Sequence, residues 1–316
     1  MLRNGMSSLY ARRVALYDEI GRGYAAVRVE DPRLARPIWD ALGDARTVVK
    51  VGAGAGSYEP RDREVTAVEP SAVMIAQRPA GAAPAVLASA ERLPFPDDSF
   101  DAAMAIITLH HWNNVDAGLR EMRRVARRRI VIVTFDPALE ADLWIARDYI
   151  RDQVIQTFAS LPLISRVLET FPEAQVRPLL IPNDCSDRMF ATLWARPEAY
   201  LDPHVRAATS VWQRLPAGVE TRAIDDLRQD LASESGTSAT ATSAQPPNTT
   251  PDCASSQPSS RSWLRASGAG LRSGVEAAGI EPASAIAPVR ASTSVACALI
   301  SPDGRFAGDL PAGQPS

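Results

Sequence analysis

Lysine is almost absent from this chain of 316 residues: Lys50 is its one lysine, and arginine supplies the other basic side chains. Cysteine and histidine are also scarce, with three of each. The cysteines, Cys185, Cys253 and Cys297, form no CxxC pair, and so few ligands exclude a convincing zinc site. We therefore expect no metal centre and free thiols in a reducing compartment.

Long apolar runs are missing as well. No segment approaches the ~18 consecutive apolar residues of a membrane span, and the first twenty or so residues lack the apolar region of a signal peptide. A net charge of -3 offers no excess of positive charge for nucleic acid or an anionic membrane. These absences predict a soluble, cytoplasmic protein without a nucleic-acid partner; they leave its oligomeric state open.

The composition changes near residue 231. Residues 1–231 contain periodic apolar segments, whereas residues 232–316 are mostly Ala, Ser, Gly, Thr and Pro. Such a tail has too little apolar surface to offset the entropy of ordering it, which predicts disorder. Its texture also suits a spurious or frameshifted extension, and this origin is a hypothesis. We expect one domain over 1–231 followed by a low-complexity tail.

Strand-like and helix-like segments alternate in the first domain. The β-rich runs are 47–51, 64–69, 83–89, 100–108 and 129–136, with a sixth candidate at 175–181. Helical patterns occur at 34–43, after Pro70, and at 115–127. This alternation predicts an α/β fold with a doubly wound, mostly parallel, Rossmann-like sheet. No convincing closing strand follows the last helical pattern.

A glycine-rich turn, "VGAGAG", directly follows the first predicted strand. Gly52, Gly54 and Gly56 allow the backbone to turn tightly and to approach a ligand closely. The second strand ends in Glu69, whose carboxylate can accept hydrogen bonds from the two hydroxyls of a ribose. Because ligands bind at the carboxyl ends of parallel strands, the two features together predict a nucleoside-containing cofactor.

Five ordered motifs between Ile38 and Asp136 carry a resemblance to a known family. They are the glycine turn, "AVEPS", "AERLPFPDDSFDAA", "LHHW" and "LREMRRVARRRIVIVTFD". Together they resemble the class I S-adenosylmethionine-dependent methyltransferases, most closely the small-molecule, ubiquinone/menaquinone-methyltransferase-like group (methyltransferase type 11). The resemblance implies a transferase with S-adenosyl-L-methionine as cofactor and a small molecule as methyl acceptor.

The resemblance also implies roles for particular residues. Those expected to line the cofactor are Val51, Gly52, Ala53, Gly54, Gly56, Glu69, Pro70, Ser89, Ala90, Glu91, Thr108 and Leu109. His110 and His111 are candidate catalytic residues; neighbours in a strand point to opposite sides, so one of them is expected to face the cofactor. The region 144–171 is expected to form a substrate-binding insert, and Tyr17, Tyr24 and Arg28 are candidate contacts that close over the cofactor.

Two departures from the family pattern leave alternatives open. Lys50 stands where relatives carry an acidic or small polar residue, and we expect its side chain to turn outward to solvent. Ser89 replaces an aspartate common in relatives. With the missing closing strand, these features leave open a catalytically impaired, methyltransferase-like binding protein. An NAD-type oxidoreductase is a weaker alternative, because its G-x-G-x-x-G turn and Tyr-x-x-x-Lys pair are absent.

Overall fold

The computed structural model describes residues 24–158, 163–237 and 294–300. The chain divides into two compact units, one of residues 1–233 with 292–316 and one of residues 234–291. Of the second unit, the described part is the end of a single helix, so the fold below is that of the first. No helix in the described ranges is long and apolar enough to cross a membrane.

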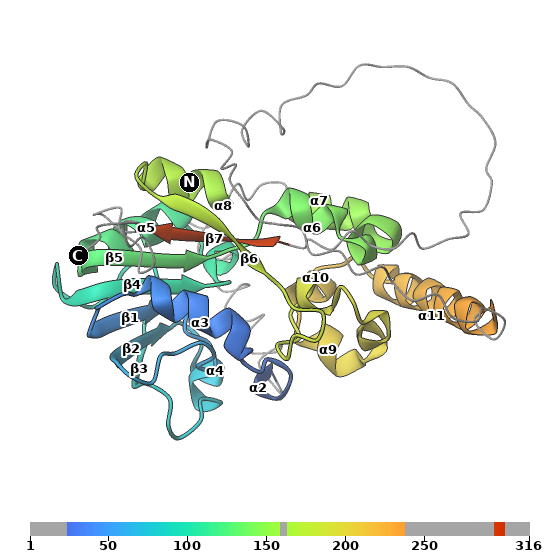
Figure 1. The fold of residues 1–316 in the computed structure, drawn as a ribbon, viewed down its shortest axis with the longest axis horizontal. Helices are drawn as coiled ribbons and strands as arrows, with labels where there is room; N and C mark the ends of the chain where they lie inside the picture. The colour runs from blue at the N-terminus through green and yellow to red at the C-terminus, as the bar shows by residue number, and fades with distance from the viewer. Residues whose placement is uncertain (1–23, 159–162, 238–293, 301–316) are drawn as a thin grey trace, which may run out of the picture. The chain divides into compact units, whose positions relative to one another are not determined.

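A seven-stranded sheet in the order β3-β2-β1-β4-β5-β7-β6 forms the centre of the first unit (Figure 1). The strands are β1 (Thr47–Val51), β2 (Glu64–Glu69), β3 (Ala85–Leu87), β4 (Phe100–Ile106), β5 (Ala126–Val133), β6 (Gln175–Leu180) and β7 (Ser294–Ile300). β1 to β5 pair in parallel, and β7 pairs antiparallel with both β5 and β6. The predicted α/β, mostly parallel fold is therefore confirmed.

The central strands are buried on both faces. In β1 the consecutive residues Val48, Val49, Lys50 and Val51 are all buried, where a half-exposed strand would alternate. Runs of this kind occur in parallel sheets whose two faces are both covered by helices. β5 begins at Ala126, immediately after a helix, which is earlier than the strand predicted from the sequence.

The first helices begin at side-chain caps. α3 (Pro32–Ala41), α4 (Ala72–Ala76) and α5 (Val115–Val125) start after Asp31, Ser71 and Asn114, whose side chains each accept a hydrogen bond from a backbone amide of the first turn. α3 packs against β5, and α5 packs against β4 and β5. A short helix, α2 (Tyr24–Val27), precedes α3.

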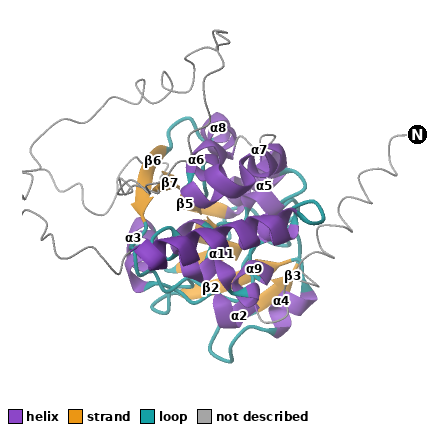
Figure 2. Cartoon of the chain, turned by 90° about the vertical axis from the view of Figure 1, so that its right-hand side faces the viewer, coloured by secondary structure: helices purple, strands orange, loops and turns teal. Residues whose placement is uncertain are grey.

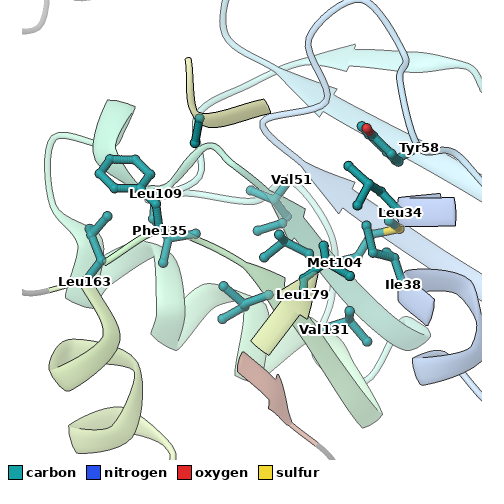
Figure 3. Close-up of a cluster of buried hydrophobic side chains, with 14 of the residues drawn as sticks. Leu34, Ile38, Val51, Tyr58, Met104, Leu109, Val131, Phe135, Leu163 and Leu179 are labelled. Atoms are coloured by element: carbon teal, nitrogen blue, oxygen red, sulfur yellow. The ribbon is translucent and has the colours of Figure 1, made fainter. Parts of the chain in front are cut away.

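One continuous apolar core joins the sheet to its helices (Figure 3). Leu34 and Ile38 of α3 lie beside Met104 of β4 and Val131 of β5, while Phe135 and Leu109 lie near the ends of the strands. All of these side chains are buried. This core fixes the carboxyl ends of β1, β2 and β4, where ligands bind in sheets of this type.

The region after β5 is largely helical. It contains α6 (Pro137–Asp142), a π-helical turn η2 (Ala146–Ile150), α7 (Arg151–Phe158) and α8 (Leu163–Thr170) before β6. After β6 come η3 (Ala191–Leu193), η4 (Pro197–Leu201), α9 (Pro203–Ala207), α10 (Ser210–Gln213) and α11 (Val219–Thr237), some of which are labelled in Figure 2. The helical spacing predicted for 144–171 is thus present in the described part of that region.

The structure has a closing strand where the sequence offers none. β7 lies within the predicted tail, and its register pairs Val133 with Cys297 on one side and Leu180 with Ser294 on the other. The expectation of a sheet without this strand is therefore wrong. A seven-residue run that is distant in the sequence, but paired with β5 and β6, supplies it. The disorder predicted elsewhere in 238–316 falls outside the described residues.

Candidate active site

The glycine loop after β1 turns with left-handed backbone angles. Gly52 has a φ of 68° and Gly54 a φ of 55°, and a Cβ atom added to Gly52 would lie 2.1 Å from Oγ1 of Thr108. The amides of Gly52 and Ala53 both donate to the carbonyl of Val68, at 2.9 and 3.0 Å. Glycine is therefore required at position 52, where backbone angle and close packing both exclude a side chain.

Lys50 lies beneath this loop. Its side chain is buried, and Nζ donates to the carbonyl of Ala53 at 3.3 Å and to the carbonyl of Ser57. The outward orientation expected from the sequence is wrong, because the loop carbonyls and Glu59, 3.7 Å away, give the ammonium partners inside the protein. Burial lowers the pKa of Lys50 to about 8, against the opposing effect of Glu59.

A second buried cation also holds the loop. Nη1 of Arg78 donates to the carbonyl of Gly54 at 3.2 Å, and Nη2 donates to both carboxylate oxygens of Glu59 at 2.8 Å. Glu59 thereby lies between the two cations, Lys50 and Arg78. The result is a loop whose carbonyls are held by two cations.

Glu69, at the end of β2, is already engaged by backbone amides. Its Oε2 accepts from the amide of Gly54 at 2.8 Å, and its Oε1 accepts from the amide of Ser71 at 3.0 Å. Burial raises the pKa of this carboxyl, while the two amides act in the opposite direction. Since each carboxylate oxygen has a second acceptor position, Glu69 retains capacity for a ligand.

An open cleft of about 980 Å³, counted to its solvent mouth, extends along these strand ends. Nine of the predicted cofactor residues line it: Gly52, Ala53, Gly54, Glu69, Pro70, Ser89, Ala90, Glu91 and Thr108. The structure does not bring Val51, Gly56 or Leu109 to its wall. Val51 and Leu109 are fully buried in the core, and Gly56 faces Arg78 and Ala82.

A buried ionic cluster closes one side of the cleft. Arg28 donates through Nε to Oδ1 of Asp187 at 2.6 Å and through Nη1 to the hydroxyl of Tyr24 at 2.6 Å, while the hydroxyl of Tyr58 donates to Oδ2 of Asp187 at 2.9 Å. Asp187 is fully buried, so its charge is held by these donors. Tyr24 and Arg28 line the cleft as the sequence suggested; Tyr17 is outside the described residues.

A second pocket, of about 600 Å³ to its mouth, adjoins the cleft. Tyr24, Arg28, Ile107 and His111 line both cavities. Ile107 has a φ of 48°, a strained angle for a β-branched residue, at the point where β4 ends between the two. Further residues of the second pocket are His110, Phe135, Glu140, Met189, Phe190, Ala191, Ala208, Thr209, Ser210 and Val211.

The two histidines belong to a 3-10 turn, η1 (Leu109–His111), and not to a strand. His110 is buried against Phe135, with ring centroids 5.0 Å apart. It borders the second pocket but not the cleft. His111 borders both cavities, so it is the one of the pair at the cofactor cleft. The two side chains therefore do not alternate as they would in a strand. Even so, one histidine of the pair borders the cleft, as the sequence predicted.

Comparison with known proteins agrees with this geometry. Residues 49–133 match the family model of the methyltransferase domain named Methyltransf_11. A crystal structure from Anabaena variabilis, provisionally described as a methyltransferase from an antibiotic biosynthesis pathway, is 30% identical; the match covers 68% of this chain and 91% of that one, with a TM-score of 0.61. The chain belongs to the class I S-adenosylmethionine-dependent methyltransferases.

Two curated relatives of this methyltransferase cover less of the chain. The uncharacterized protein YafE of Escherichia coli is 29% identical over 153 residues, which are 45% of this chain and 68% of YafE. The ubiquinone/menaquinone biosynthesis C-methyltransferase UbiE of Burkholderia mallei is 39% identical over 59 residues, 18% of this chain. This second match spans about a quarter of the length of UbiE, namely 24%.

The residues present in the cleft suit the cofactor of this family, S-adenosyl-L-methionine. The loop at its floor has no side chain at Gly52 or Gly54, and the buried carboxylate of Glu69 stands at the end of β2. Family membership overturns the NAD-type oxidoreductase alternative. Sequence reasoning missed Tyr58, which lies just after the glycine turn, and Asp187 and Glu140, which lie outside the five motifs.

Proposed function

We propose that this methyltransferase transfers the methyl group of S-adenosyl-L-methionine to a small-molecule acceptor held in the second pocket. The observation that carries the proposal is the junction of the two cavities at Tyr24, Arg28, Ile107 and His111. Donor and acceptor bound in adjoining cavities meet at such a junction, and positioning of this kind supplies much of the rate of a transfer from an activated donor.

The cofactor supplies a methyl group on a positively charged sulfur, ready for displacement by a nucleophile. Glu69 binds the ribose hydroxyls through its free acceptor positions, and Ser89 and Ala90 border the adenine. The glycine loop, fixed from below by Lys50 and Arg78, borders the methionine portion. These assignments are the ones that the family resemblance implies, and Glu69, Ser89, Ala90 and the glycine loop all line the cleft.

His111 is the better placed of the two candidate catalytic histidines, because it borders both cavities. It can orient the acceptor or take its proton when the reacting atom carries one. His110, buried against Phe135, supports the wall of the second pocket. The proposed catalytic unit is the domain over 1–231 together with β7, and its cytoplasmic location remains a prediction.

The structure weakens the alternative of a catalytically impaired, methyltransferase-like binding protein. The closing strand is present, and the ammonium of Lys50, which also lines the cleft, is paired with loop carbonyls and with Glu59. Ser89 lines the cleft beside Ala90, whose backbone remains available to an adenine. These observations favour the enzyme over the binding protein.

Binding of S-adenosylmethionine and S-adenosylhomocysteine by calorimetry tests the proposal. In Glu69→Gln we expect both dissociation constants to rise about 30- to 150-fold, because a charge-assisted pair of ribose bonds is lost. Glu64→Gln, at the exposed start of the same strand, is the matched control and should leave both constants unchanged.

An analogue separates ribose binding from the effect of Glu69 on the loop. Removal of the 2′-hydroxyl from S-adenosylhomocysteine should weaken binding to the wild type and change it little in Glu69→Gln. Equal losses in both proteins would contradict the assignment of Glu69. A folded wild type that binds neither cofactor form at millimolar concentration would contradict the proposed function itself.

A further inference from the structure

The second pocket has a mostly apolar wall with a carboxyl group in it. Phe135, Met189, Phe190 and Val211 provide apolar surface, and Glu140 of α6 contributes the carboxyl group. Among the described residues, Glu140 has no hydrogen-bond or ion-pair partner for its side chain. A carboxyl group without a hydrogen-bond or ion-pair partner in a mostly apolar pocket is suited to bind a polar group of a ligand.

The other charges around the pocket are compensated by the protein. Arg28 also borders the pocket, but both of its bonds to Asp187, at 2.6 and 3.3 Å, hold its charge against a fully buried carboxylate. The remaining titratable side chains that line the pocket are Tyr24, His110 and His111, and Tyr200 lies close enough to interact electrostatically with Glu140. Glu140 is therefore the acidic group with capacity left for a ligand.

We propose that the methyl acceptor is a small, largely apolar molecule that carries a protonated amine, and that the carboxylate of Glu140 binds this amine. The proposal rests on the proposed function, because it assigns the acceptor to the second pocket. The apolar wall would enclose the body of such a molecule, while the guanidinium of Arg28 is already ion-paired with Asp187 and so offers little attraction to an anionic one.

The ionisation of Glu140 makes the proposal sharper. Burial raises the pKa of Glu140 to about 8, so the group is mainly neutral at pH 7 and must ionise to hold a cation. That ionisation costs about tenfold in affinity at pH 7, whereas close charge pairs in desolvated sites contribute tenfold or more. Amine binding should therefore strengthen with pH as long as the amine stays protonated.

Three probes of similar size distinguish the charge of the acceptor: 2-phenylethylamine, 2-phenylethanol and 3-phenylpropionate. Their affinities are measured by calorimetry on the full chain saturated with S-adenosylhomocysteine, at pH 6.5 and 8.5. We expect the amine to bind at least about tenfold more tightly than the alcohol at pH 8.5, and the anion to bind most weakly. Amine affinity should rise about twentyfold between the two pH values, with that of the alcohol nearly constant.

Glu140→Gln should abolish both the preference for the amine and its pH dependence. Asp142→Asn, on the same helix and ion-paired with Arg151, is the matched control and should retain both. Equal affinity for the three probes, a preference for the anion, or a preference that survives in Glu140→Gln would overturn the inference. Failure to bind S-adenosylhomocysteine would instead overturn the proposed function, so the two failures are distinguishable.

Discussion

Replacement of Lys50 by methionine tests whether the glycine loop has a buried cation beneath it. Lys50 has a pKa of about 8 in the fold, whereas an unfolded chain gives lysine its model value of 10.5. Between these values the unfolded state binds more protons than the native state, so stability must rise as pH increases. Below pH 8 the ammonium is charged in both states and the contribution is constant and unfavourable.

The size of this effect follows from the two pKa values. Linkage gives a gain of about 2 kcal/mol in the free energy of unfolding between pH 7 and pH 9.5. Lys50→Met lacks the group and should lack this gain, so the difference between wild type and mutant should change by that amount. At pH 7 the mutant also loses the bonds to Ala53 and Ser57, and a buried carbonyl left without a donor costs about 1–3 kcal/mol.

Urea denaturation of both proteins across this pH range provides the measurement. Arg36→Met is the control. It removes an exposed cation on α3 whose ion pair with Asp40 is long, at 4.0 Å, so it should shift stability equally at each pH. A wild-type minus Lys50→Met difference that stays flat from pH 7 to pH 9.5 would refute the buried position of Lys50. The same proteins should show a weaker cofactor affinity in the mutant, because the loop carbonyls lose a fixed donor.

Two further predictions concern the loop and the closing strand. Gly52→Ala should lower the free energy of unfolding by at least about 2 kcal/mol and abolish S-adenosylhomocysteine binding, because the new Cβ would meet Thr108 at 2.1 Å in a left-handed backbone. Urea melts would measure the stability and calorimetry the binding. A stable mutant that still binds S-adenosylhomocysteine would contradict the close packing of Gly52 against Thr108. Truncation after residue 293 removes β7 and should destabilise the fold by several kcal/mol, at about 1–3 kcal/mol for each buried backbone group that loses its partner. Truncation after Ile300 keeps β7 and is the control. Equal urea midpoints for the two truncated proteins would count against the strand.

The parts of the fold that could be predicted are those encoded by local pattern. β1, β2 and β4 are short apolar runs. Gly52 directly follows β1 and Glu69 ends β2, so their positions at the carboxyl ends of the strands follow from topology. Boundaries shifted by a few residues, as in β5, because α5 passes into the strand without a turn. Most predicted cofactor residues accordingly line one cleft.

The parts that could not be predicted depend on contacts between distant segments. Lys50 was expected to reach solvent, but the carbonyls that bind it come from a loop whose path is set by Glu59 and Arg78. Asp187 lies outside the five motifs and acquires its role through Arg28, 159 residues earlier in the sequence. The apolar surroundings of Glu140 likewise come from residues much later in the sequence, such as Met189, Phe190 and Val211.

The position of β7 has a consequence for the order in which the protein can fold. Among the strands that the structure describes, β6 pairs with β7 and not with β5, with Leu180 beside Ser294 and Gln175 beside Leu299. During synthesis the chain must therefore make β6, α9 and α11 before the strand that fixes β6 exists. The segment just after β6 carries Asp187 and Phe190, so the Arg28–Asp187 ion pair and the part of the second pocket around Phe190 should form late, and slowly, because the ion pair is a contact of long sequence separation.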